Sequence, residues 1–156
     1  MLRIDRLDSP VGELAIVVDA DGGLRALGWR GPWPEAVACA DPGGVTTALR
    51  RYFAGELAAL DALPVVFEGS EFQCRVWNAL RELRPGETCS YGHIARRIGQ
   101  PTAVRAVGLA NGANPVAIVV PCHRVIGANG TLTGYGGGLE RKRWLLDHER
   151  RDLFRR

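Results

Sequence analysis

The chain has 156 residues and a mass of 16.9 kDa, which is enough for one ordinary domain or two small ones. Hydrophobic residues make up 46% and charged residues 24%, values that exclude a disordered or fibrous protein. The apolar runs are too short to cross a bilayer, and the charged first ten residues do not resemble a signal peptide. We therefore expect a soluble, cytoplasmic protein without a membrane partner.

The formal net charge of +3 permits nucleic-acid binding without requiring it. Lys142 is the only lysine, so nearly all of the positive charge is arginine. A coding bias is the simpler explanation, although arginine is also the better residue for gripping phosphates and stacking on bases.

The four cysteines have no regular spacing: they are Cys39, Cys74, Cys89 and Cys122. Disulfides are not expected in a cytosolic chain, and zinc sites use closely spaced ligand pairs, which neither the cysteines nor the three histidines supply. We predict no metal. The open question is whether one of these cysteines is a reactive thiolate.

The first third of the chain has strand patterns at residues 2–7, 14–18 and 23–29. Asp21-Gly22-Gly23 is a hairpin turn signal between the last two. The apolar spacing from Val45 to Ala54 predicts a helix that ends at Gly55. Residues 1–68 are therefore predicted to form a small domain of a sheet and a helix.

Helices dominate the remainder, residues 69–156. Ser70-Glu71-Phe72-Gln73 is a capping box that opens a helix. A second helix, Tyr91 to Ile98, follows the cap Ser90, and a third is expected from Thr102 to about Ala110, with Pro101 at its start. Two short helices joined by a turn at Gly99 form a helix-turn-helix pattern, typical of DNA binding and also of ordinary packed helices. The predicted fold class is thus mixed α/β (α+β).

The apolar run Val116–Val120 is predicted to be a buried strand that leads to Pro121, Cys122 and His123. A glycine-rich loop, 127–138, and a last helix, Glu140 to Glu149, complete the chain. Cys122 is either an activated thiolate or a small buried hydrophobic residue. Because neighbours in an extended chain point to opposite sides, His123 acts on Cys122 only in a tight turn or through a water molecule.

Several motifs in the second half occur together in a fixed order: Ala103-Val104-Arg105-Ala106-Val107-Gly108, Asn114-Pro115, Pro121-Cys122-His123-Arg124-Val125, Gly134-Tyr135, Gly137-Gly138, Lys142 and Leu145-Leu146-x-x-Glu149. With this set the chain resembles the O6-alkylguanine-DNA alkyltransferases (methylated-DNA–protein-cysteine methyltransferases) of the bacterial type. The strong match covers about residues 70–150. The N-terminal part is similar only in its general layout.

The resemblance implies that Cys122 takes the alkyl group from a flipped O6-alkylguanine, a single-use transfer without cofactor. Glu149 would orient His123, which reaches Cys122 through water, and Asn114 would brace the active-site strand against the DNA-binding helix. Arg105 would fill the gap in the duplex, and Tyr91 would turn the flanking phosphate and donate near the guanine O6. The other expected contacts to DNA or base are Val125 through its carbonyl, Tyr135, Gly136 and Gly137 in the closing loop, and Thr102, Ala103 and Arg96 on the helix-turn-helix.

The implied partner is double-stranded DNA bound through its minor groove, by a monomer whose cooperativity along DNA stays open, as does repair of O4-alkylthymine. Three other interpretations compete with repair. An alkyltransferase-like protein binds the lesion without transfer, but such proteins lack the cysteine. A helix-turn-helix regulator leaves the Cys-His segment unexplained. A cysteine hydrolase would turn over esters or amides.

Overall fold

A computed structural model describes residues 1–154, with side chains described as far as residue 150. The arginine-rich end, 150–156, is predicted from its sequence either to contact phosphates or to fray, and it lies almost wholly outside the described side chains. No helix in the described part is long and apolar enough to span a membrane.

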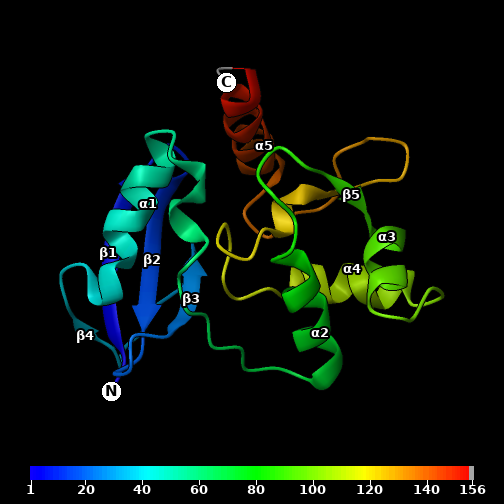
Figure 1. The fold of residues 1–156 in the computed structure, drawn as a ribbon. Coiled ribbons are helices and arrows are strands. Elements are labelled where there is room, and N and C mark those ends of the chain that lie inside the picture. Colours follow the sequence, from blue (N-terminus) through cyan, green and yellow to red (C-terminus); the bar gives the residue numbers. More distant parts are fainter. Residues whose placement is uncertain (155–156) are drawn as a thin grey trace.

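The N-terminal half is a four-stranded sheet in the order β3-β2-β1-β4 (Figure 1). Its strands are β1 (Arg3–Ser9), β2 (Gly12–Val18), β3 (Leu24–Gly28) and β4 (Val37–Ala38). β1, β2 and β3 are antiparallel neighbours, as expected for hairpins, and they confirm the three predicted strands. β4 pairs in parallel with β1 and is too short, at two residues, to leave a pattern.

The helix α1 (Val45–Phe53) packs beside the sheet, flanked by the 3-10 turns η1 (Pro42–Gly44) and η2 (Leu57–Leu60). It ends as predicted at Gly55, which has φ 112°. The Gly55 N–H donates to the carbonyl of Tyr52 and the Glu56 N–H to that of Arg51, the two bonds of a Schellman cap.

The C-terminal half contains α2 (Glu71–Leu80), α3 (Tyr91–Arg97), α4 (Val104–Gly112) and α5 (Leu139–Phe154). The capping box at Ser70 and Gln73 and the cap at Ser90 both form as predicted. α3 and α4 pack together, with Gly99 at φ 77° in the turn between them. The helix α4 begins two residues later than predicted, because the Ala103 N–H still closes a turn onto Gln100.

The run Val116–Val120 is buried but is not the predicted strand. Only its start pairs with β3: the Leu27 N–H donates to Pro115 and the Ala117 N–H to Leu27. The chain then turns, with Val120 N–H donating to Val116 O at 3.0 Å and Ile118 at φ 71°. The apolar sequence correctly predicted that this run is buried. It did not predict the backbone conformation, because a buried turn and a buried strand have the same composition.

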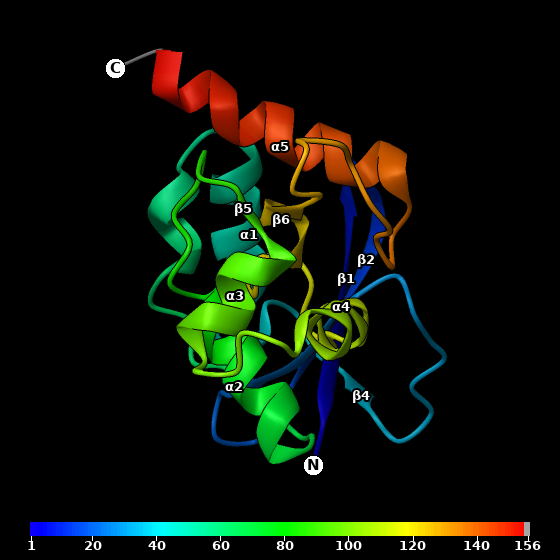
Figure 2. The same ribbon diagram turned by 90° about the vertical axis from the view of Figure 1, so that its right-hand side faces the viewer.

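Two short strands, β5 (Cys89–Ser90) and β6 (Val125–Ile126), pair in parallel and were not predicted. They tie the start of α3 to the segment after Cys122. One contiguous core contains side chains from both halves, and α5 runs across one end of the molecule over the sheet and the C-terminal helices (Figure 2). The division at residues 68 and 69 stays a prediction.

Candidate active site

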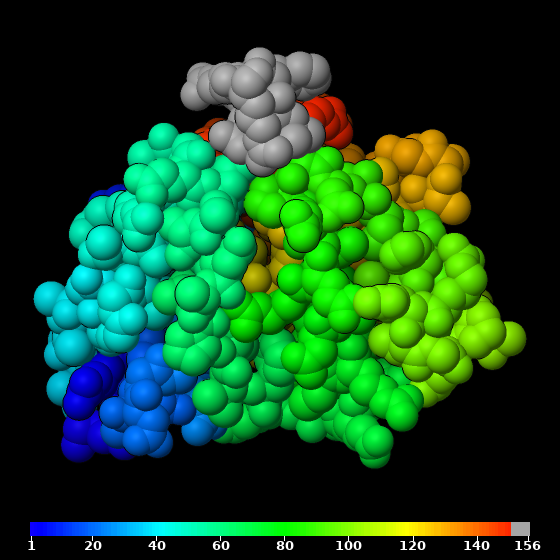
Figure 3. All heavy atoms as spheres, viewed as in Figure 1, coloured from blue at the N-terminus to red at the C-terminus, as the bar shows by residue number. Residues whose placement is uncertain are grey.

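A cavity of about 150 Å³ lies between the sheet and the C-terminal half, and Cys122 is in its wall. Part of the lining comes from β2, β3 and the loop after β3, including Ala15, Ala26, Gly28, Trp29 and Trp33. The rest comes from the C-terminal half and includes Asn111, Asn114, Ala117, Tyr135, Gly136 and Gly137. Neither Cys39, Cys74 nor Cys89 lines it. A second, smaller pocket is lined by residues that include Leu60, Arg81, Val119 and Pro121, and in Figure 3 the yellow segment near residue 120 is visible in a narrow hollow between the two halves.

Cys122 begins a single 3-10 turn, η3 (Cys122–Arg124), in which the Arg124 N–H donates to Pro121 O at 2.9 Å. A tight turn is one of the two arrangements, the other being a bridging water, in which His123 acts on Cys122. Burial raises the pKa of the Cys122 thiol, while the Asn114 side chain and the positive charge of Lys142 act in the opposite direction. Cys122 is 6% exposed, so the sulfur reaches only what enters the cavity.

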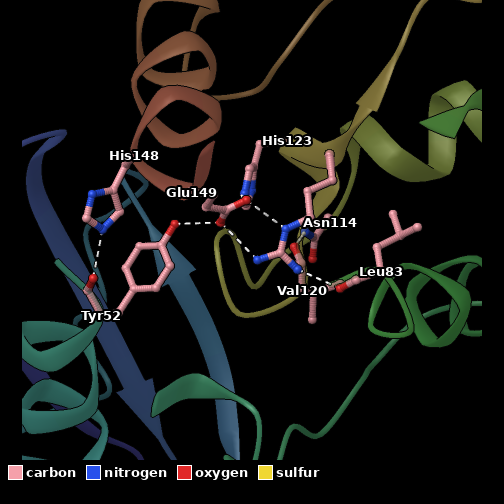
Figure 4. A network of polar contacts seen from close by, with 8 residues as sticks. Tyr52, Leu83, Asn114, Val120, His123, His148 and Glu149 are labelled. Carbon is pink, nitrogen blue, oxygen red and sulfur yellow. Dashed lines mark hydrogen bonds and ion pairs between the residues drawn. The ribbon is translucent and has the colours of Figure 1, made fainter. Parts of the chain in front are cut away.

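His123 and Glu149 form the predicted pair, fully buried, with 2.8 Å between His123 Nε2 and Glu149 Oε2 (Figure 4). Burial lowers the pKa of His123, which favours the neutral imidazole, although Glu149 opposes this effect. A neutral ring that donates from Nε2 leaves Nδ1 as its proton acceptor. His123 Nδ1 is buried and has no hydrogen-bond partner among the described residues.

Arg124 completes the network around the carboxylate. Its Nε donates to Glu149 Oε1 at 2.8 Å and its Nη2 to Oε2 at 2.9 Å, a bidentate pair. Burial alone would raise the pKa of Glu149, but His123 and Arg124 together hold it well below its usual range. Glu149 is therefore ionised. Arg124 lies within the motif of residues 121–125, but its bond to Glu149 was not predicted, because the motif carried no separate signal for this side chain.

Two asparagines hold the segment that leads to Cys122. Asn114 Nδ2 donates to Val120 O at 2.8 Å and its Oδ1 accepts from the Val116 N–H at 2.9 Å. These bonds stabilise the buried turn from within, and a brace by Asn114 against the DNA-binding helix stays a prediction. Asn111, which the sequence analysis missed, lies 4% exposed on α4, and its Nδ2 donates to Cys122 O at 3.4 Å. The sequence signal that indicates a role for Asn111 is a polar residue on the buried face of a predicted helix.

The loop before α5 closes the cavity against Trp29. The Tyr135 hydroxyl is buried without a partner among the described residues, and burial raises its pKa well above the usual value, so it stays a donor. The Trp29 and Tyr135 rings meet edge to face at 6.0 Å. A Cβ on Gly137 would lie 2.5 Å from the Trp29 ring, so only glycine fits, whereas Gly136 has room. Sequence reasoning missed Trp29.

The residues predicted to touch the duplex do not line the cavity. Arg105 and Arg96 are exposed and form no ion pair among the described residues, and Thr102 and Ala103 lie in the turn before α4. The Tyr91 hydroxyl lies 2.6 Å from Thr133 Oγ1, at the base of the closing loop. The Val125 carbonyl accepts from Lys142 Nζ at 2.6 Å, so a guanine amine would need its second lone pair.

Among the described residues no three His, Cys, Asp or Glu side chains gather as metal ligands. The described part thus consists of a helix-turn-helix joined to a closed cavity in which a buried cysteine lies next to a His-Glu-Arg network. This arrangement defines a class of protein that combines a nucleic-acid-binding element with a nucleophilic thiol.

Comparison with known proteins identifies the family. A family model described as the DNA binding domain of 6-O-methylguanine DNA methyltransferase matches residues 71–151. A methylated-DNA–protein-cysteine methyltransferase of Shigella flexneri is 45% identical and covers 96% of this chain and 97% of its own length. One from Mycolicibacterium paratuberculosis is 51% identical, with coverages of 97% and 94%.

The crystal structure of Mycobacterium tuberculosis OGT in complex with DNA aligns with a TM-score of 0.84 and 46% identity, over 97% of this chain and 93% of that one. The chain belongs to the methylated-DNA–protein-cysteine methyltransferase family, as the sequence motifs indicated.

Proposed function

We propose that the chain repairs DNA directly by moving the alkyl group of O6-alkylguanine onto Cys122. Membership in the methyltransferase family supports this activity, and DNA is the partner. The observation that carries the assignment to Cys122 is its place in the wall of the cavity, next to the buried His123–Glu149 pair.

In the proposed reaction His123 accepts the thiol proton at Nδ1, through a water molecule as the resemblance implies, and Glu149 stabilises the imidazolium. The sulfur attacks the alkyl carbon, so a carbon–sulfur bond forms as the carbon–O6 bond breaks. The electron pair passes to guanine, which takes up a proton. Tyr135 is a buried donor in the same cavity and is available to the base. A thioether is not hydrolysed, so each molecule acts once.

The helix-turn-helix would dock in the minor groove, with Arg105 entering the space that the flipped nucleotide leaves. Arg96, Thr102 and Ala103 would contact the backbone nearby, and Tyr91 the flanking phosphate. The exposure of Arg96, Thr102 and Arg105 on α3, α4 and the intervening turn supports this arrangement, whereas Tyr91 and Ala103 are partly buried. We further propose that the protein acts in the cytoplasm as a monomer, since one copy supplies both the cavity and the DNA-binding helices.

The test is an intact-mass measurement after mixing the protein with a duplex containing O6-methylguanine, followed by peptide mapping. We expect a gain of one methyl group on the Cys122 peptide and none in Cys122→Ala, which should still bind the duplex. Lesion-selective binding without any mass change would support a recognition protein instead. Preference for one undamaged sequence would support a regulator, and turnover of an ester would support a hydrolase.

A further inference from the structure

The carboxylate of Glu149 has a hydrogen-bond partner from the other half of the molecule. Tyr52, on α1, is fully buried, and its hydroxyl donates to Glu149 Oε2 at 2.6 Å across a separation of 97 residues (Figure 4). A buried tyrosine hydroxyl needs a partner, but a backbone carbonyl would satisfy it equally well. Its actual partner is the acid of the active site.

Tyr52 is held in place from two directions. Its backbone carbonyl lies 2.8 Å from His148 Nε2, so consecutive residues of α5 bind its two polar ends. Its ring packs edge to face against Phe53 at 5.2 Å and His148 at 5.1 Å. The hydroxyl therefore cannot leave the carboxylate without moving either α1 or α5.

Three donors converge on Glu149 Oε2: the Tyr52 hydroxyl, His123 Nε2 and Arg124 Nη2. We propose that Tyr52 is a positioning residue for alkyl transfer, which fixes the Glu149 carboxylate and limits its attraction for the His123 proton. This inference rests on the proposed function, because it assigns a purpose to the same network. It also gives the N-terminal half a direct part in the reaction.

The reason is electrostatic. A donor to Oε2 takes up part of the negative charge that would otherwise stabilise the His123 imidazolium, so removing it should make His123 easier to protonate. Removing the Tyr52 hydroxyl replaces no other charged or titratable group around the network. Those facing Glu149 or His123 are Arg124 of η3, Lys142 of α5 and Tyr135 of the closing loop, while His148 faces the Tyr52 carbonyl.

The test is Tyr52→Phe in the full chain, which keeps the ring and removes only the hydroxyl. We expect the pKa of His123, measured by NMR titration of the imidazole nitrogens, to rise by about one unit, because one hydrogen bond to a charged group is worth roughly that much. The acid limb of the rate of transfer from free O6-benzylguanine should move to higher pH by the same amount. Below the midpoint of this acid limb, the transfer rate of Tyr52→Phe should be about tenfold lower than that of the wild-type protein at the same pH.

The matched control is Phe53→Leu, which disturbs the same aromatic cluster without touching Glu149. It should lower the melting temperature and leave the His123 pKa and the pH profile where they are. A His123 pKa in Tyr52→Phe that is unchanged or lower would overturn the proposal and leave Tyr52 as packing. Absence of transfer in the wild-type protein would count against the proposed function instead, and the NMR measurement would still decide the role of Tyr52.

Discussion

At the scale of single residues, the active site depends most on the charge of Glu149. Replacing it by glutamine removes the partner of the buried Arg124, and an unpaired buried charge is strongly unfavourable. We expect Glu149→Gln to lower the free energy of unfolding by about 3–5 kcal/mol, measured by urea denaturation. Glu140→Gln, an exposed change on the first turn of the same helix, should alter it by less than about 0.5 kcal/mol.

Glu149 also makes the stability depend on pH. Its pKa is lower in the folded than in the unfolded protein, where it is near 4.5, so the unfolded state binds the proton more readily. The stabilisation is complete above that value and is lost progressively as the pH falls below it. Between pH 7 and pH 3.5 His123→Asn should therefore lose more stability than His123→Asn/Glu149→Gln, a pair of proteins in which His123 no longer titrates. Parallel losses in the two proteins would contradict this explanation.

Gly136 is the position at which the closing loop leaves room for larger alkyl groups. A Cβ there would have the Gly112 carbonyl 3.9 Å away as its nearest neighbour, so Gly136→Ser should fold normally while narrowing the cavity. We expect the ratio of benzyl to methyl transfer rates to fall by about tenfold, since pockets discriminate by such factors when one small group is added. An unchanged ratio of benzyl to methyl transfer rates would contradict this prediction.

At the scale of elements, the proposed DNA-binding surface comprises the exposed arginines of α3 and α4, Arg96 and Arg105 among them. Arg96→Ala should weaken DNA binding at every sequence and reduce the slope of log affinity against log salt by about one, because one phosphate contact is lost. Fluorescence anisotropy over a salt series measures both effects. The control is Arg51→Ala on α1, an exposed arginine in the N-terminal half, for which the slope should not change.

The ends of the helices show how far sequence patterns reach. Caps at Ser70 and Ser90 and glycines at positions 55 and 99 act through their own neighbours, so the sequence predicts these helix ends well. The start of α4 was predicted two residues too early, because a local turn from Ala103 to Gln100 precedes the helix. The two-residue strands β4, β5 and β6 were missed, because their hydrogen bonds depend on partners distant in the chain.

At the scale of the whole molecule, the two halves share one core and are joined by backbone bonds between β3 and residues 115–117. We therefore expect one cooperative unfolding transition, with equal calorimetric and van't Hoff enthalpies and a heat-capacity change of about 2 kcal/mol/K. Scanning calorimetry measures all three quantities. Two separated transitions would instead support independent domains divided near residue 68.

The sequence alone predicted the residues of the candidate site: Cys122 as the nucleophile, His123 and Glu149 as its partners, Asn114 as a brace, and the arginine-bearing helix-turn-helix. These residues follow one another in motifs whose spacing is local, so they are visible without coordinates. The tertiary structure decided what surrounds them. Tyr52, Trp29 and Asn111 reach the site only because the sheet, α4 and α5 pack together, and the segment before Cys122 turns because β3 pairs with no more than its first residues. Contacts across such distances depend on how the elements pack, which no local pattern in the chain encodes.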